Sequence, residues 1–112
     1  TEKKQELLLR ATEFDSPDLA DQVARFIGDD NATIRFLAFD AAFNQSNGDA
    51  LGTAVFEQLV EEDSLRIQKK VLEKLPERKD FIVPEELREA VEELLPAGLG
   101  VHKQGYVYQR RR

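Results

Sequence analysis

The chain has 112 residues and a formal net charge of −6, with 41% apolar and 34% charged residues, so we expect one domain with a densely charged surface. It contains no cysteine and one histidine, His102, which excludes disulfide scaffolds, thiolate zinc sites and cysteine nucleophiles. No run approaches the roughly 18 apolar residues of a membrane-spanning helix. Because the first residue is Thr1 rather than methionine, we expect a segment excised from a longer chain. A cytoplasmic location is a separate expectation.

Six helices are predicted between residues 2 and 95, because apolar residues recur at helical spacing in six successive segments. The apolar faces, in chain order, are Leu7, Leu8, Ala11 and Phe14; Leu19, Ala20, Val23, Phe26 and Ile27; Ile34, Leu37, Ala38, Ala41 and Ala42; Leu51, Ala54, Val55, Phe56, Leu59 and Val60; Leu65, Ile67, Val71, Leu72 and Leu75; and Leu87, Ala90, Val91, Leu94 and Leu95.

The breaks between these segments carry recognisable helix-start and turn residues. Ser16 is a good N-cap and Pro17 suits a first helical turn. Asp30 or Asn31 is expected to cap the third helix, and Asp63 or Ser64 the fifth. No strand is predicted before residue 100, so the body is expected to be all-α.

The helices repeat in pairs along the chain. A shift of 33 residues places Asp30 on Asp63 and Ile34 on Ile67, and a shift of 35 places Phe56 on Val91. A repeated helix pair is typical of a stack, because one pair cannot bury both of its apolar faces alone. The alternative is an irregular helical bundle. The residues expected between pairs are Ile34, Ala38, Phe56, Leu59, Ile67, Val71 and Val91.

Residues 28–43 resemble the first helix of a HEAT repeat, which begins with an acidic cap and continues with a β-branched residue, an arginine and a small apolar residue. The next repeat keeps Asp63 and Ile67 but has Gln68 where arginine is expected. The matching residues in the first of these segments are Asp30, Ile34, Arg35 and Ala38.

This resemblance implies a right-handed α-solenoid of about three antiparallel helix pairs over residues 1–100, followed by an extended basic tail at 101–112. It implies a scaffold or adaptor surface rather than a reaction, with the second helix of each pair on the inner, concave side. Because this architecture serves many tasks, the resemblance is more specific for fold than for function.

Candidate catalytic and metal-binding groups are weak when taken singly, so we expect neither an enzyme nor a cofactor or metal. His102 lies in a glycine-flanked segment and is expected to be an exposed tail residue. Acidic pairs such as Asp29-Asp30 and Glu61-Glu62 are expected to be solvated at caps and polar faces, where burial does not raise their pKa. The glycine-rich loop of a phosphate site and the spacing of a calcium loop are both missing from the sequence.

The charges divide by helix class. The second helices of the pairs carry ten acidic residues against Arg25 and Arg88, a net charge of −8, whereas the first helices carry eight bases against five acids, or +3. An acidic groove of this kind attracts a basic peptide or a basic protein surface. The simpler alternative is that an acidic protein is acidic somewhere. The predicted partner-binding residues here are Asp18, Asp21, Glu57, Glu61, Glu85, Glu89 and Glu92.

The tail at 101–112 has the opposite charge, with four basic residues and no acid. Tyr106 and Tyr108 lie on one side of a predicted extended segment, close to Arg110. Three outcomes are considered: a disordered end, a segment folded back on the body, and an arm that pairs with another chain. We expect order by contact and assign Tyr106, Tyr108 and Arg110 to partner binding. Contact with nucleic acid or a membrane surface is expected only through this tail.

The sequence therefore predicts a protein-interaction module that binds a basic partner through the second helices. An accessory domain of a larger enzyme or of a cofactor-attachment factor is the alternative.

Overall fold

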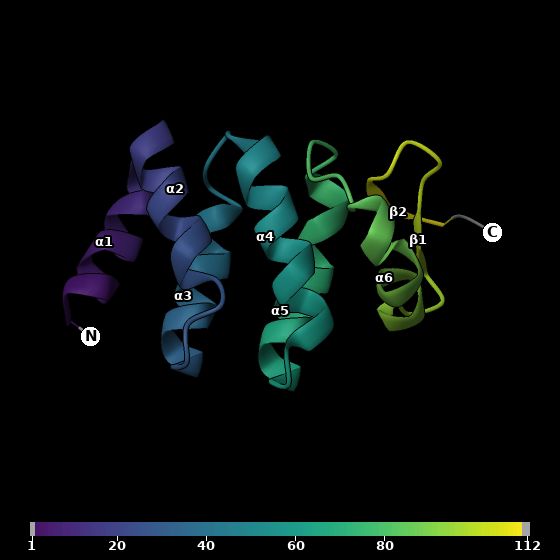
Figure 1. Ribbon diagram of the computed structural model, residues 1–112, viewed down its shortest axis with the longest axis horizontal. Coiled ribbons are helices and arrows are strands. Elements are labelled where there is room, and N and C mark those ends of the chain that lie inside the picture. Colours follow the sequence, from purple (N-terminus) through teal and green to yellow (C-terminus); the bar gives the residue numbers. More distant parts are fainter. Residues whose placement is uncertain (1, 111–112) are drawn as a thin grey trace.

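The computed structural model describes residues 2–110, in which six α-helices follow one another along the longest axis of a molecule measuring 43 × 26 × 25 Å (Figure 1). Thr1, Arg111 and Arg112 lie outside the described residues. The helices are α1 (Glu2–Glu13), α2 (Pro17–Phe26), α3 (Ala32–Ala42), α4 (Gly48–Glu61), α5 (Leu65–Lys74) and α6 (Arg88–Leu94), with 3₁₀ turns at Leu75–Glu77 and Glu85–Leu87.

Side-chain caps fix three of the predicted helix starts. The Ser16 side chain accepts a hydrogen bond from the Leu19 amide at 3.1 Å, and the Ser64 hydroxyl accepts one from the Ile67 amide at 3.4 Å. Of the two candidates at the start of α3, Asn31 is the cap, since its side-chain oxygen accepts from two amides of the first turn.

The helices contact one another in two series. The first helices pack in the order α1, α3, α5, and the second helices in the order α2, α4, α6. All seven residues predicted to lie between the pairs are at most 2% exposed, so the burial prediction is confirmed. Three residues from the predicted apolar faces are exposed instead. Phe14, at 58%, follows the end of α1, and Leu65, at 79%, begins α5 on a side that no helix covers. The third is Ala90 of α6.

The predicted mostly helical body is confirmed, but a small antiparallel sheet follows α6, and its first strand begins just inside the range assigned to the helical domain. Its strands are β1 (Leu99–Val101) and β2 (Val107–Gln109), with Gly100 opposite Tyr108. Gly105 turns the chain between them at a φ of +104°.

This hairpin packs against the helical part of the domain and is not a separate tail. Val107 is fully buried, and the Val83 amide donates to the Gly105 carbonyl at 2.8 Å. The segment is therefore ordered by contact with its own domain, which is one of the outcomes considered. Within residues 2–110, none of the helices has the length and apolar character needed to cross a membrane.

Candidate functional site

The seven acidic side chains predicted to bind a partner are all exposed. Because α2 contacts α4, and α4 contacts α6 and the turn before it, these residues lie on neighbouring elements of one helix series. We call them the acidic surface: Asp18 and Asp21 on α2, Glu57 and Glu61 on α4, and Glu85, Glu89 and Glu92 on the last turn and α6.

A hollow of about 310 Å³ lies between α2 and α4 within this surface. Its lining includes the carboxylates of Glu57 and Glu61 and the guanidinium of Arg25. Small residues form part of the floor: a Cβ added at Gly28 would already touch the Gln58 side chain at 3.4 Å. The hollow therefore places two carboxylates and a guanidinium beside small residues of α2, α4 and the turn that follows α2.

A second hollow, of about 500 Å³, lies over α6 and the 3₁₀ turn before it. Arg88 donates from Nε to Glu92 at 3.1 Å and from Nη2 to the His102 carbonyl at 3.2 Å, so this cation also holds α6 to the hairpin. Three other carboxylates line the hollow, and none of them forms an ion pair within residues 2–110. They are Glu85, Glu89 and Glu93.

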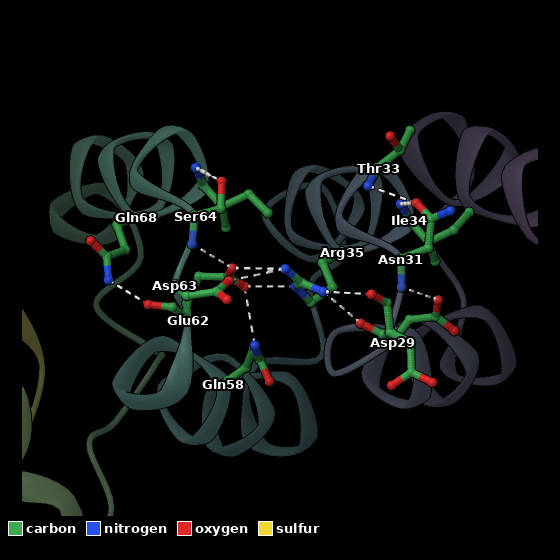
Figure 2. A network of polar contacts seen from close by, with 12 residues as sticks. Asp29, Asn31, Thr33, Ile34, Arg35, Gln58, Glu62, Asp63, Ser64 and Gln68 are labelled. Atoms are coloured by element: carbon green, nitrogen blue, oxygen red, sulfur yellow. Dashed lines mark hydrogen bonds and ion pairs between the residues drawn. The ribbon is translucent and has the colours of Figure 1, made fainter.

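One acidic residue expected at the surface is buried. Glu62 ends α4 and is only 4% exposed, so its predicted solvation is wrong. Its Oε1 accepts from Arg35 Nε at 2.9 Å and from Gln58 at 3.1 Å, while its Oε2 accepts from Arg35 Nη2 at 3.1 Å and from the Ser64 amide at 3.0 Å (Figure 2).

Arg35 uses its remaining nitrogen on the loop that precedes α3. Its Nη1 donates to the carbonyls of Asp29 and Asp30, at 2.9 and 3.1 Å (Figure 2). Burial by itself raises the pKa of Glu62, but the hydrogen bonds from Arg35, Ser64 and Gln58 outweigh it and hold that pKa below its ordinary value. The pair therefore stays ionised and joins two helix pairs through their loops.

The resemblance to a HEAT repeat singles out Arg35 in the sequence, but nothing in the sequence analysis identifies Glu62 as its partner. Nothing in the run Glu61-Glu62-Asp63 separates the buried acid from its exposed neighbours, because all three have the same chemistry. The 33-residue shift distinguishes Glu62 from its neighbours, because it places Glu62 on Asp29. Asp29 is itself in an ion pair with a residue of a first helix, Lys4, at 2.6 Å.

Two of the tail residues assigned to partner binding, Tyr106 and Tyr108, both pack against His102. The His102 ring stacks on Tyr106, with centroids 4.5 Å apart, and meets the edge of Tyr108 at 5.7 Å. His102 is half-buried, and its Nδ1 accepts from the Gln104 amide at 3.1 Å, so the expected exposed tail residue is instead part of the hairpin. Arg110 is exposed just after β2.

Arg88, which pairs with Glu92 of the acidic surface, also joins α6 to the tail through its bond to the His102 carbonyl. Among the described residues, no group of three or more acidic or histidine side chains is arranged to hold a metal ion. Comparison with known proteins finds no matching family model, no matching curated protein and no matching solved structure.

Proposed function

We propose that this chain is a HEAT-like, right-handed α-solenoid of three helix pairs that acts as a protein-interaction module. Support for the stack comes first from the two helix series, in which first helices pack on first helices and second helices on second helices.

Polar contacts that repeat at the loops give further support. Lys4 of α1 contacts Asp29, and Arg35, 31 residues further along, contacts Glu62, which lies 33 residues after Asp29. Each contact joins a first helix to the loop at the end of its own pair. Such a recurrence is expected when one structural unit is used twice.

A second recurrence lies at the opposite ends of the helices. Gln45 donates to the Ala11 carbonyl at 2.6 Å, and Arg78, which follows it by 33 residues, donates to the Ala42 carbonyl at 3.2 Å. In both cases the loop within one pair satisfies a carbonyl near the end of the preceding first helix, a group that helix geometry leaves without an internal partner.

The acidic surface is the proposed binding site, and its partner is a basic protein surface or peptide. The observation that carries this proposal is the exposure of all seven predicted carboxylates on one helix series, where ten exposed acids accompany only Arg25 and Arg88. The ten acids counted from the sequence include Glu62, which is buried. The ten exposed acids counted here include Asp49 of α4 instead. A surface of one sign accelerates encounter with the opposite sign.

The test is a charge reversal with a control of equal charge. Changing Glu57, Glu61 and Glu89 to lysine removes three carboxylates of the acidic surface, and the probe is a fluorescent ten-residue peptide of alternating lysine and glycine. We expect the association rate to fall and to lose most of its dependence on salt, while the melting temperature changes little, because exposed charges contribute little to stability.

The control changes Glu2, Glu6 and Glu13 to lysine, which shifts the net charge equally but acts on exposed positions of α1. This control should bind the peptide almost as the natural chain does. If both triple variants lost binding to the same extent, the peptide would be responding to net charge and the acidic surface would not be a site.

A further inference from the structure

A groove of about 510 Å³ lies between α5 and the hairpin, away from the acidic surface. Its apolar part comes from both elements, and its edge carries Lys69 and Glu73 one helical turn apart. Leu65 stands in it at 79% exposure. The apolar residues are Leu65, Leu72, Pro76, Pro96 and Leu99.

This side of α5 corresponds to the side of α3 on which α5 itself packs. The two helices begin 33 residues apart, so Phe36 corresponds to Lys69 and Asp40 to Glu73. On α3, the Phe36 ring lies beneath the cations of two α5 residues, Arg66 at 4.6 Å and Lys70 at 4.4 Å.

The same interface on α3 also contains an ion pair and a buried ring. Asp40 contacts Lys70 at 3.1 Å, and Lys74 lines the hollow beside Asp40. Phe39 is fully buried, whereas the corresponding Leu72 is only partly buried. The groove on α5 is thus a helix-docking position that continues an interface already present in the molecule.

The position of the hairpin determines whether one helix or a helix pair can pack at this end of the molecule. In the second helix series, β1 contacts α6 and lies beyond it at the end of the molecule (Figure 1). The place beside α6 that a further second helix would need is therefore taken. The groove beside α5 is open along its border with the hairpin, which favours a single helix over a helix pair as its occupant.

We infer that this groove docks a single amphipathic helix from a partner protein, with an acidic residue facing Lys69 and a basic residue facing Glu73. The acid follows from charge complementarity: Lys69 stands where α3 presents the Phe36 ring to the Arg66 guanidinium, so the docked residue in the place of Arg66 meets a cation instead of a ring. The base follows from Glu73, which stands where Asp40 meets Lys70. Apolar residues on the same face of the helix would cover Leu65 and Leu72.

The probe is a fluorescent peptide with the sequence of residues 64–77, the segment that already fits the equivalent site on α3. One substitution, Arg66→Glu, matches it to Lys69, and Lys70 is kept to face Glu73, as it faces Asp40 on α3. A hydrocarbon staple between positions 69 and 73 holds the peptide helical. The matched control peptide has the same staple with the natural Arg66.

Fluorescence anisotropy with the complete chain gives the Kd of each peptide. We expect the glutamate peptide to bind about tenfold more tightly than the control peptide, because the glutamate introduced at position 66 attracts Lys69, whereas the Arg66 of the control peptide repels it. The protein variant Lys69→Glu should reverse this preference. Equal Kd values for the two peptides, or an unchanged preference in Lys69→Glu, would overturn the inference.

Two further variants separate this groove from other sites. Leu65→Ser should weaken the glutamate peptide, whereas Leu9→Ser, at another exposed leucine outside the groove, should not. If the cationic control peptide still binds to the Leu65→Ser variant, that binding is assigned to the acidic surface. The proposal for the acidic surface and the proposal for the groove can therefore fail independently. Sedimentation velocity tests whether the chain self-associates. If it does, and if Leu65→Ser abolishes the self-association, then a second copy of the chain occupies the groove and the inference of a partner helix is overturned.

Discussion

At the scale of single residues, the pair between Arg35 and Glu62 has the largest consequences. Each oxygen of the buried carboxylate accepts two hydrogen bonds, which offsets the loss of water around the charge. The Arg35 side chain is also largely buried, and its other donors are used by the carbonyls of Asp29 and Asp30. Removing Arg35 therefore leaves the buried Glu62 carboxylate without a cation, whereas removing Glu62 leaves Arg35 with the exposed Asp63, at 3.5 Å, as its ion-pair partner.

We predict that Arg35→Ala destabilises the domain by about 3–5 kcal/mol, because it leaves the Glu62 carboxylate buried without its cation. Urea unfolding followed by circular dichroism gives the free energy of unfolding. Arg10→Ala, at an exposed position of α1, is the matched control and should change it little. The double variant Arg35→Met with Glu62→Leu should recover most of the loss, since it leaves no buried charge; a double variant as unstable as Arg35→Ala would contradict this explanation.

The same pair predicts a loss of stability in acid. The folded-state pKa of Glu62 lies below its ordinary value, so its contribution is complete above the unfolded value of about 4.3 and disappears as the pH falls through the folded value. Urea midpoints measured from neutral pH down to about pH 3 should fall less steeply for Glu62→Gln than for the natural chain. Parallel curves for the two proteins would show that other carboxylates cause the acid sensitivity.

At the scale of elements, amphipathic spacing identifies which residues face the core but not which outer faces are covered. Ile67 and Leu65 were both assigned to the apolar face of α5, yet Ile67 is 2% exposed and Leu65 79%. They differ by two positions, or about 200° around a helix, so they point to different sides. Only the position of the neighbouring helices determines that one side is filled and the other open.

We predict that Ile67→Ala costs about 2–5 kcal/mol of unfolding free energy, as large-to-small changes in a packed core do. Leu65→Ala, on the same helix, should cost less than about 0.5 kcal/mol, because its side chain is already in contact with water. Thermal or urea unfolding of the two variants side by side measures the difference. Similar losses in both would contradict the packing described for α5.

The pairing of the two hairpin strands could not be predicted from the sequence. The β-propensity of the segment around Tyr106 and Tyr108 was evident, but strands of three residues give too short an alternation to predict pairing. The decisive facts are tertiary: Val107 enters the core, and Gly105 bonds to Val83, which lies 22 residues earlier in the chain.

At the scale of the whole molecule, the number of helices, the seven inter-pair core residues and the exposure of the acidic surface were all predictable. Each depends on local periodicity or on composition. The partner of Arg35 and the open side of α5 were not, because each depends on how one helix pair lies against the next.

The distribution of buried residues along the chain predicts uneven stability. The middle helices α3 and α4 contribute five and six buried residues, whereas α1 and α5 contribute two each. In a stack whose units contact only their neighbours, an end unit can open while the middle stays folded. We predict that native-state hydrogen exchange is slowest in α3 and α4 and clearly faster in α1, whose main helix neighbours are α2 and α3.

The variant Ile67→Ala makes this test directional. Its cavity lies in α5, so in a neighbour-coupled stack it should accelerate exchange in α5 and α6 far more than in α1, because the lost contacts are not shared with the first pair. In a domain that unfolds as one unit, the same substitution would accelerate the slowest amides of every helix by an equal factor. Equal acceleration in α1 and α6 would therefore contradict the stack, whereas a gradient that declines from α5 toward α1 is the result we expect.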